Sequence, residues 1–442
     1  MRSRKSRIAR CNLLVVHLSV LMFCVSTLVY VSFTRAVPLV EVVHFTQEIR
    51  SKRIATADLH DGTRIDIPSI FMDLGHEVLN LGFKGKRGPY PIPLARMTYP
   101  SRKLSPVLMA YNSHSTRLSE SMVQELFEYY KDDDDILQVD AFYCQFPPAM
   151  CELFLPFNRT IIINASHRLF LGRCSQTDSQ RFVEHLRKMS SGVLGTRHFI
   201  TANNVYDSEY TKYFTGLDVP VIAASSYGYQ YCSYAPKHPE IIVGPTQLKE
   251  VPEVVNSSKF TFRTMKSLYG RFEVDDMCRH KAFVIIPYAT HSYGIIEPYS
   301  LSIPMFAPSI EFALRERFFV DKSVSDPSYC GKEFKPPSWN SGSQPYSPED
   351  DSDEAQRHWL QFAEVYQLPF IQHFDSLEHL EALLESANFS DIHYKMAAFN
   401  RKKRAQVYSQ IHDLAGRISQ RGELPRTFSE AVKPWGETFM AT

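Results

Sequence analysis

The sequence has almost no net charge and no extended basic patch. Its 442 residues include 49 lysines and arginines against 48 aspartates and glutamates, a formal net charge of +1. Proteins that bind a nucleic-acid backbone gain much of their affinity from clustered Lys and Arg, so such binding is not expected here. With 44% hydrophobic residues, the chain has an ordinary globular composition and is long enough for two domains.

The segment Leu13–Phe33 contains no Lys, Arg, Asp or Glu. As a helix it would span roughly 30 Å, the thickness of a bilayer core. A cleaved signal peptide is the alternative, but its apolar core would be only about 7 to 15 residues long, and no clear small-x-small cleavage site precedes Pro38. Five basic residues precede the segment, and Arg35 alone closely follows it. We therefore expect a cytosolic tail at residues 1–12, an uncleaved anchor, and a lumenal remainder.

Two further features agree with a lumenal location. Four N-glycosylation sequons follow the expected anchor, at Asn158, Asn164, Asn256 and Asn388. Six cysteines also follow it, an even number that allows up to three disulfides in any of fifteen pairings. These cysteines are Cys144, Cys151, Cys174, Cys232, Cys278 and Cys330. No CxxC or Cys/His spacing predicts zinc, and reduced buried cysteines remain an alternative.

After a short stem at residues 34–50, residues 51–238 are expected to form a Rossmann-like domain. Segments with strand and helix periodicity alternate along it, for example a strand at 107–111, a helix at 119–130 and a strand at 160–164. Such alternation is typical of a parallel sheet with helices on both faces, an α/β fold.

Residues 239–442 are expected to form a second Rossmann-like domain, whose first strand begins at Ile241. Lys335–Glu354 is rich in Pro, Ser and acidic residues, so we expect an exposed loop that packs no core. A long helix from Ser390 to Ile418 follows near the end of the chain. The predicted fold class is therefore two doubly wound parallel-sheet domains behind a transmembrane helix.

The stretch Lys281–Glu311 carries the clearest functional pattern. A buried strand leads into the loop His291-Ser292-Tyr293-Gly294, followed by a helix and a second strand. A glycine-bearing loop that feeds a helix directs N–H groups and the positive helix end at one point, where a phosphate can bind. Glu297, in the first helical turn, could accept hydrogen bonds from a sugar diol. The ordinary alternative is that Glu297 only complements the helix dipole.

This stretch resembles the donor-nucleotide site of GT-B glycosyltransferases, which has an aromatic–glycine loop, a Glu, and a Pro seven residues later. Glu297 and Pro304 keep that spacing. Gly75-His76-Glu77-Val78 is similar to the turn that ends the first helix in many GT-B enzymes. Ala289 stands where the fuller pattern has another Glu, a departure that bears on the stereochemical outcome. The resemblance covers about residues 53–420, and it implies sugar transfer from a nucleotide sugar.

The resemblance also implies that acceptor groups gather at strand ends of the first domain. Our preferred assignment makes Asp61 an inverting base and lets His167 place the acceptor. His60, Gly62 and Thr63 would complete the acceptor loop. The alternatives are an ordinary turn at Asp61-Gly62-Thr63 and an ordinary hydrogen-bonded histidine at position 167.

In the second domain, Arg263 and Lys266 are expected to neutralise the diphosphate leaving group. As solvated surface charges they would need no explanation. No bound cofactor is expected, because the nucleotide sugar is a co-substrate, and no metal requirement is expected either.

Two other functions remain open. A metal-dependent GT-A glycosyltransferase would need a carboxylate pair, which Asp132–Asp135 or Asp275-Asp276 would supply. A non-catalytic lumenal binding protein could use the same scaffold, since fold does not fix function. Under the preferred hypothesis, the partners are a nucleotide sugar, a glycan, glycoprotein or lipid acceptor, and the membrane of the Golgi or endoplasmic reticulum, which one helix crosses.

Overall fold

The computed structural model describes residues 49–82, 95–110, 118–166, 169–171, 173, 175–227, 232–245, 249–255, 257–318, 336–436 and 439. Contacts divide the chain into two units, Met1–His44 and Phe45–Thr442. The predicted tail, anchor and most of the stem lie outside the described residues. Within the described ranges, no helix is both long enough and apolar enough to cross a membrane. The anchor at Leu13–Phe33 therefore stays a prediction.

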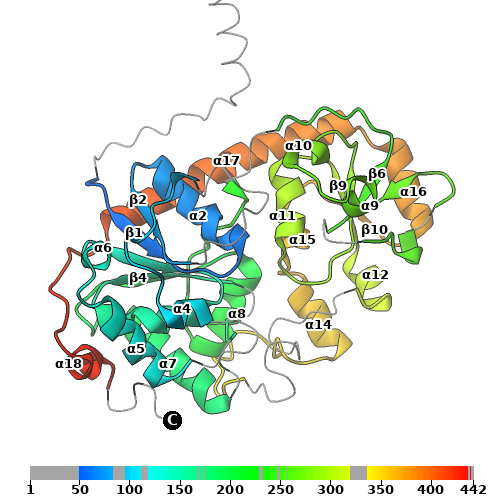
Figure 1. Ribbon diagram of the computed structural model, residues 1–442. Coiled ribbons are helices and arrows are strands. Elements are labelled where there is room, and N and C mark those ends of the chain that lie inside the picture. The colour runs from blue at the N-terminus through cyan, green and yellow to red at the C-terminus, as the bar shows by residue number, and fades with distance from the viewer. Residues whose placement is uncertain are drawn as a thin grey trace, which may run out of the picture. The chain divides into compact units, whose positions relative to one another are not determined.

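The first half of the larger unit contains a five-stranded parallel sheet in the order β2-β1-β3-β4-β5. Three of its strands, β1, β2 and β4, are labelled in Figure 1. Its strands are β1 (Arg53–Thr56), β2 (Glu77–Asn80), β3 (Ala141–Cys144), β4 (Thr160–Ala165) and β5 (Phe199–Ala202). Its helices are α2 (Asp61–Asp73), α4 (Pro106–Ala110), α5 (Glu120–Tyr130), α6 (Asp134–Leu137), the 3₁₀ segment η1 (Pro148–Phe157), α7 (Gln176–Ser191) and α8 (Val205–Thr215).

Both faces of this sheet are covered, which explains why its strands are apolar without alternation. Successive side chains of a strand point to opposite faces. Ile161 and Ile163 pack in one core, with α5, η1, α7 and α8, and Ile162 packs in another, with α2. All three are almost fully buried. The predicted α/β architecture is confirmed for this half.

The second half repeats the design. Its parallel sheet has the order β10-β9-β8-β6-β7. The strands are β6 (Ile241–Gly244), β7 (Phe262–Arg263), β8 (Phe283–Ile285), β9 (Met305–Pro308) and β10 (Gln372–Phe374). The other elements are η3 (Glu253–Val255), α9 (Met265–Tyr269), α10 (Val274–Met277), α11 (Tyr293–Ser300), α12 (Ile310–Arg315), α14 (Asp353–Leu360), α15 (Glu364–Gln367), α16 (Leu377–Ser386), α17 (Phe389–Gly416), α18 (Phe428–Val432) and η5 (Lys433–Trp435).

The two sheets have the same topology when their strands are numbered by position in each half. In each half, the first strand is an inner strand of the sheet. The second strand pairs on one side of it, and the remaining three strands lie on its other side. In open α/β sheets, ligands bind at the carboxyl ends of the strands where this reversal occurs. The reversal lies between β1 and β3 in the first half and between β6 and β8 in the second.

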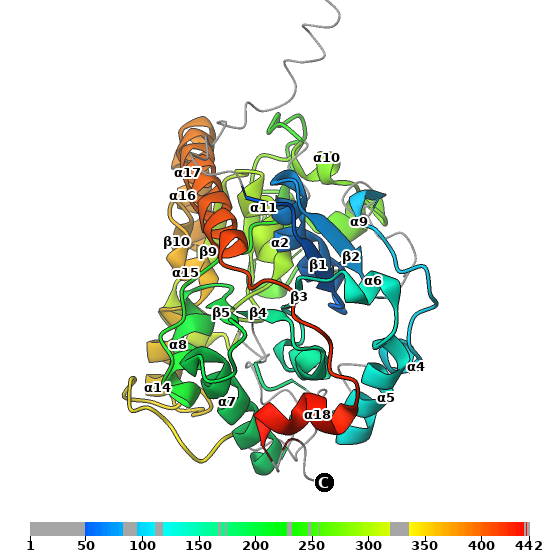
Figure 2. The same ribbon diagram turned by 90° about the vertical axis from the view of Figure 1, so that its left-hand side faces the viewer.

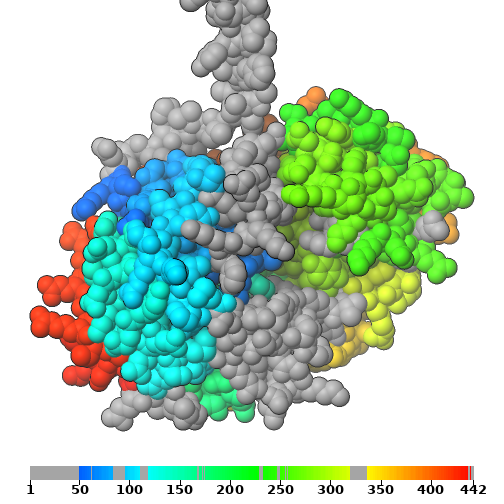
Figure 3. All heavy atoms as spheres, in the orientation of Figure 1, coloured from blue at the N-terminus to red at the C-terminus, as the bar shows by residue number. Residues whose placement is uncertain are grey.

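Helix α17 belongs to the cores of both halves. Near its start, Ile392 and Met396 pack with α11 and β8 of the second half. Near its end, Val407 and Ile411 pack with α2 and β1 of the first half. Helix α18 then lies against α5 and η1 of the first half, as Figure 2 shows for α5. Figure 3 shows the same molecule with all heavy atoms.

Three predictions of local structure were wrong. Residues 107–111 were predicted as a strand, but Pro106, which favours a first helical position, begins α4. The predicted loop at His60–Thr63 is the N-cap and first turn of α2. The segment after Lys335 is irregular, as predicted, yet it packs: Trp339 lies under the Arg187 guanidinium, 4.0 Å from it, and Ser341 donates to the carbonyl of Tyr213 on α8.

Candidate functional site

In the first half, the strand reversal brings Asp58 and the β3–η1 loop together. Asp58 follows β1, and its Oδ1 accepts hydrogen bonds from the backbone N–H groups of Gln145 (2.8 Å) and Phe146 (3.2 Å). Its Oδ2 is buried and has no hydrogen-bond partner within the part of the chain that the structure describes. The two N–H donors act to lower the pKa of Asp58, but the effect of burial is larger and raises this pKa to about 7. A carboxyl group that titrates near neutrality lies at the expected ligand-binding edge.

A second buried carboxylate, Asp66 on α2, holds the segment that leads to the second half. Its Oδ1 accepts from the N–H of Tyr227 (2.7 Å), and its Oδ2 accepts from the N–H of Ser225 (3.0 Å) and the hydroxyl of Tyr293 (3.2 Å). Between the two donors, Ser226 has a φ of 50°, so the chain curves around the carboxylate. Burial raises the pKa of Asp66 to about 6, although the hydrogen-bond donors act to lower it.

In the second half, the strand reversal leads into α11. The loop after β8 ends at Ser292, the N-cap of α11, whose hydroxyl accepts from the N–H of Gly294 (3.2 Å). The side chain of Glu297 is buried in the first turns of this helix. The order strand, loop, helix, strand agrees with the prediction for Lys281–Glu311, with β9 two residues later than expected.

The two strand reversals are joined by a chain of side-chain hydrogen bonds. The Tyr143 hydroxyl donates to Gln145 Oε1 (2.6 Å), and Gln145 Nε2 donates to Asn203 Oδ1 (3.2 Å). Asn203 Nδ2 lies 2.9 Å from His291 Nε2, and His291 Nδ1 lies 2.7 Å from Glu364 Oε2. We call these five residues the polar bridge.

Backbone geometry fixes the direction of the polar bridge. The N–H of Ala224 also donates to Asn203 Oδ1 (3.1 Å), so this oxygen accepts and Nδ2 donates to His291. In its neutral form, His291 therefore accepts at Nε2 and donates at Nδ1 to Glu364. Burial lowers the pKa of His291, but the Glu364 carboxylate, together with smaller effects of two other acidic side chains, raises the pKa overall.

Aromatic rings pack where α2 and α11 begin. The rings of His60 and Tyr293 are stacked with centroids 5.5 Å apart, and His291 meets Tyr293 edge-on at 5.7 Å. A Cβ added to Gly62 would lie 3.0 Å from the Tyr293 ring, so a larger residue there would force a shift. The carboxyl edges of the two sheets thus face each other at this junction.

Lys403, on α17, is a buried cation close to the junction. Its Nζ donates to the carbonyl of Ala224 (3.3 Å). Burial lowers the pKa of Lys403, while the charges of Glu364 and Asp66 act in the opposite direction. In the described residues, the junction therefore combines several carboxyl groups with Lys403 and with the histidines His60 and His291.

The structure places the predicted acceptor loop at this junction. His60 is the N-cap of α2, its Nδ1 accepts from the N–H of Gly62 (3.1 Å), and its side chain is exposed. Thr63 donates through its hydroxyl to the carbonyl of His60 (2.9 Å). Asp61 is the first residue of α2, and its side chain is outside the description. The proposed catalytic partner His167 also lies outside the described residues.

The predicted diphosphate-binding cations are on the surface. Arg263 ends β7 and donates to the carbonyl of Phe262, and Lys266 lies in α9. Both side chains are exposed. Because the strands are parallel, Arg263 lies at the same sheet edge as the β8–α11 loop. This position is compatible with the predicted role and with the simple surface-charge alternative.

The four sequons have different environments. Asn158 and Asn388 are exposed, and Asn256 is outside the described residues. Asn164 is 1% exposed within β4, and its Nδ2 donates to the carbonyl of Ile222. A glycan cannot be accommodated at a buried strand residue that is already hydrogen-bonded, so the prediction of glycosylation at Asn164 does not fit the folded chain.

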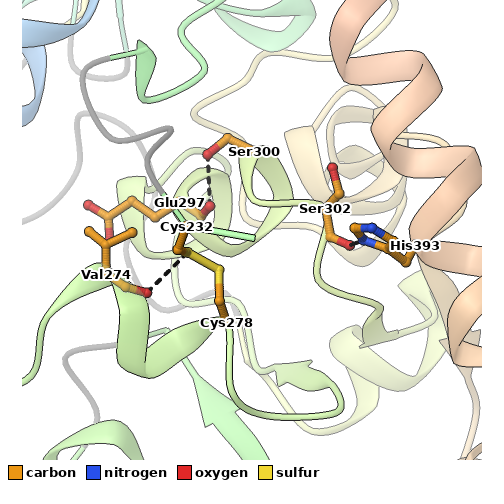
Figure 4. The surroundings of a disulfide bond; sticks show 7 residues. All are labelled: Cys232, Val274, Cys278, Glu297, Ser300, Ser302 and His393. Atoms are coloured by element: carbon orange, nitrogen blue, oxygen red, sulfur yellow. Dashed lines mark hydrogen bonds between the residues drawn. A yellow bond between two sulfur atoms is a disulfide. The ribbon is translucent and has the colours of Figure 1, made fainter. Parts of the chain in front are cut away.

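Among the six cysteines, for which every pairing was left open, one disulfide is present in the described residues. Cys232 and Cys278, which are 46 positions apart in the sequence, are bonded, and Cys232 lies against the carbonyl of Val274 (Figure 4). The same view shows Glu297 and Ser300 of α11 beside this disulfide. Cys144 and Cys151 are free and buried, as in the alternative of reduced core cysteines. Cys174 and Cys330 are outside the described residues.

The acidic pairs offered for a metal site have structural partners instead. Asp133 caps α6 by accepting from the N–H groups of Asp135 and Ile136. Asp135 pairs with Arg53 (3.2 Å), and Asp276 accepts from the N–H of Glu273 (2.9 Å). Over the described part of the chain, no group of three or more His, Cys, Asp or Glu side chains is arranged to hold a metal ion.

Sequence reasoning missed most of the junction. Asp58, Asp66, Asn203 and Glu364 were not predicted, although Asp58 and Asn203 each follow a strand at its carboxyl end. That position was the available signal for both residues. Asp66 and Glu364 lie within or at the start of helices, where an acidic residue is ordinary.

No protein-family model matches the chain, and no curated protein matches its sequence. Among solved structures, the chain is similar to CalG4, the calicheamicin glycosyltransferase, with 10% identity and a TM-score of 0.41 over 84% of this chain and 100% of that one. It is also similar to the glycosyltransferase SnogD from Streptomyces nogalater (9%, TM-score 0.37) and to the spinosyn forosaminyltransferase SpnP (9%, TM-score 0.40), each over 83% of this chain and 100% of the other. At these TM-scores the likeness is distant, and the function below is argued from the residues of this chain.

Proposed function

We propose that the chain is a glycosyltransferase of the GT-B type, which moves a sugar from a nucleotide sugar to a hydroxyl group. One observation carries this proposal: two sheets of identical topology face each other at their strand reversals. There, His291 of the second half is hydrogen-bonded to Asn203 of the first half. Each reversal is a ligand-binding position. A donor at one and an acceptor at the other would meet, as a transfer reaction requires.

The donor side would be the start of α11. Ser292 and the N–H groups near Gly294 would bind the diphosphate, and Glu297 would bind the ribose diol. Arg263 and Lys266 would add positive charge at the same sheet edge. The nucleotide sugar serves as co-substrate, and no bound cofactor or metal ion forms part of this proposal.

The acceptor side would be the start of α2. Asp61 remains the proposed base, since it opens this helix next to the exposed ring of His60. His167 remains the proposed acceptor-placing residue. The acceptor class is a glycan, a protein or a lipid that carries a free hydroxyl group.

We further propose that the folded part lies in the lumen of the Golgi or endoplasmic reticulum, behind an anchor at residues 13–33. The Cys232–Cys278 disulfide supports this location, because such bonds persist in oxidising compartments. Exposed sequons at Asn158 and Asn388 are compatible with it.

The role of Glu297 can be tested first by nucleotide binding. We would measure thermal stabilisation of the purified full chain by a panel of nucleotides and nucleotide sugars, with and without Mn²⁺. Stabilisation by one nucleotide without Mn²⁺ is expected, and its loss in Glu297→Ala would locate the donor site. Glu385→Ala, at an exposed glutamate on α16, is the matched control.

Two further outcomes decide the alternatives. Glu297→Gln keeps the size of the side chain and removes its charge: loss of transferase activity in the folded Glu297→Gln protein would oppose the non-catalytic alternative, and unchanged activity would support it or move the site away from α11. A folded wild-type chain that responds to no nucleotide would contradict the proposed function and favour the non-catalytic reading. A response only with Mn²⁺ would favour a metal-dependent enzyme.

A further inference from the structure

Tyr288 is an exposed aromatic residue in an otherwise buried loop. It lies three residues after β8, at the strand reversal of the second half. Ile286, Ala289, Thr290 and Ser292 are each at most 8% exposed, whereas Tyr288 is 40% exposed. Exposing this ring forgoes favourable burial, which is unexpected for an aromatic residue in a well-packed loop.

The ring of Tyr288 is also held in place. Its hydroxyl lies 3.1 Å from the hydroxyl of Ser292, the N-cap of α11. The side chain is therefore anchored at its polar end and leaves its apolar face toward solvent. Among the large hydrophobic residues that are exposed in the described chain, Tyr288 is the one in a loop within three residues of the carboxyl end of a strand.

A second observation in the same loop also indicates a ligand. The hydroxyl of Thr290 is buried and has no hydrogen-bond partner among the described residues, and the residue is only 7% exposed. Burying a hydroxyl without a partner costs free energy, and a bound polar molecule or water recovers this cost. The loop thus carries an apolar face and an unsatisfied polar group two residues apart.

We propose that Tyr288 is a specificity-determining residue that packs against the sugar ring of the donor. This inference rests on the proposed function, which places the diphosphate at Ser292 and Gly294. The diphosphate has two substituents, and Glu297, further along α11, is assigned to the ribose. The transferred sugar is then the substituent next to Tyr288. A pyranose has an apolar C–H face that suits an aromatic ring.

The experiment compares two affinities for each variant of the full chain. The dissociation constants of UDP-glucose, UDP-N-acetylglucosamine, GDP-mannose and GDP-fucose are measured by calorimetry, each beside UDP or GDP alone. For the donor that wild type prefers, Tyr288→Ala should weaken binding about 3- to 10-fold, the range expected for one aromatic contact. Binding of the nucleoside diphosphate alone should not change.

Two variants serve as controls. Tyr288→Phe keeps the ring and loses only the bond to Ser292, so it should retain most of the discrimination between nucleotide sugar and nucleoside diphosphate. Tyr394→Ala removes another exposed tyrosine, 71% exposed on α17, and should behave as wild type.

The outcomes separate this inference from the proposed function. If wild type binds nucleotide and Tyr288→Ala weakens nucleotide sugar and nucleoside diphosphate equally, Tyr288 contacts the nucleotide and the sugar-ring assignment is wrong. If neither affinity changes, Tyr288 has no role in donor binding, while the proposed function stands. A folded wild-type chain that binds none of these compounds overturns both.

Discussion

The two strand reversals share one topology but differ in the groups that they place there. In the first half, the reversal holds carboxyl groups, Asp58 and Asp66, which accept from backbone N–H groups. In the second half, it presents the start of a helix, with the hydroxyls of Tyr288 and Ser292. One side holds acids with raised pKa values, and the other offers the positive end of a helix. The same fold thus suits proton acceptance on one side and anion binding on the other.

Asp58→Asn is expected to have the largest effect on stability. The pKa of Asp58 is raised from 3.8 to about 7, so the folded state binds its proton more tightly than the unfolded state. This contribution is full below about pH 4 and is lost as the pH rises through about 7. Asn keeps the Oδ1 acceptor for Gln145 and Phe146 without the buried charge. Relative to wild type, the variant should gain up to about 4 kcal/mol in unfolding free energy at pH 8.

Urea unfolding of both proteins at pH 4 and pH 8 measures this effect. At pH 4 the two should differ by less than about 1 kcal/mol, because Asp58 is protonated in the folded wild-type chain and partly protonated in the unfolded one. Asp413→Asn, at an exposed residue of α17, should give a small difference that does not depend on pH in this way. Equal stabilities of wild type and Asp58→Asn at pH 8 would mean that Asp58 is not charged and buried at that pH.

Asp66→Asn should give a lower free energy of unfolding than Asp58→Asn. Both oxygens of Asp66 accept hydrogen bonds, so an amide NH₂ group would face either the N–H of Tyr227 or the N–H of Ser225. A lost acceptor of this kind costs about 1 to 3 kcal/mol. At pH 8 we expect Asp66→Asn to be less stable than Asp58→Asn by this amount in the same urea measurement. Equal stabilities would remove the distinction between the two carboxyl groups.

Tyr293→Phe tests the smallest of these differences. It removes the hydroxyl bond from the second half to Asp66 and keeps the ring contacts with His60 and His291. The expected loss is about 1 kcal/mol in unfolding free energy. The pKa of Asp66 should also rise, since the charged carboxylate loses a donor, and NMR titration of the carboxyl group would show this. Tyr394→Phe, at an exposed residue, should change neither quantity.

Local signals in the sequence were enough for much of the fold. Gly75 has a φ of 84°, as its predicted place at the end of a helix requires, and α2 and β2 flank it. The unit from β8 through α11 to β9 was recognisable from short-range periodicity and from Glu297. Where a neighbouring Pro or cap changes the outcome, as at Pro106, the apolar pattern of a short segment could not distinguish a strand from a helix.

The junction was harder to predict because its contacts join distant parts of the chain. Asn203 and His291 are 88 residues apart, and His291 and Glu364 are 73 apart. No local pattern links such residues. The packing of the segment after Lys335 was missed for a related reason: its composition is typical of a free loop, and its partners, Arg187 and Tyr213, lie on α7 and α8 of the other half.

Helix α17 has a consequence for how the molecule unfolds. Met396 lies in the core of the second half and Ile411 in the core of the first, on one continuous helix. If either half loses its structure, the end of α17 that packs there is exposed, and the fraying of that end removes support from the other half. The two halves are therefore expected to act as one cooperative unit rather than as two independently melting domains.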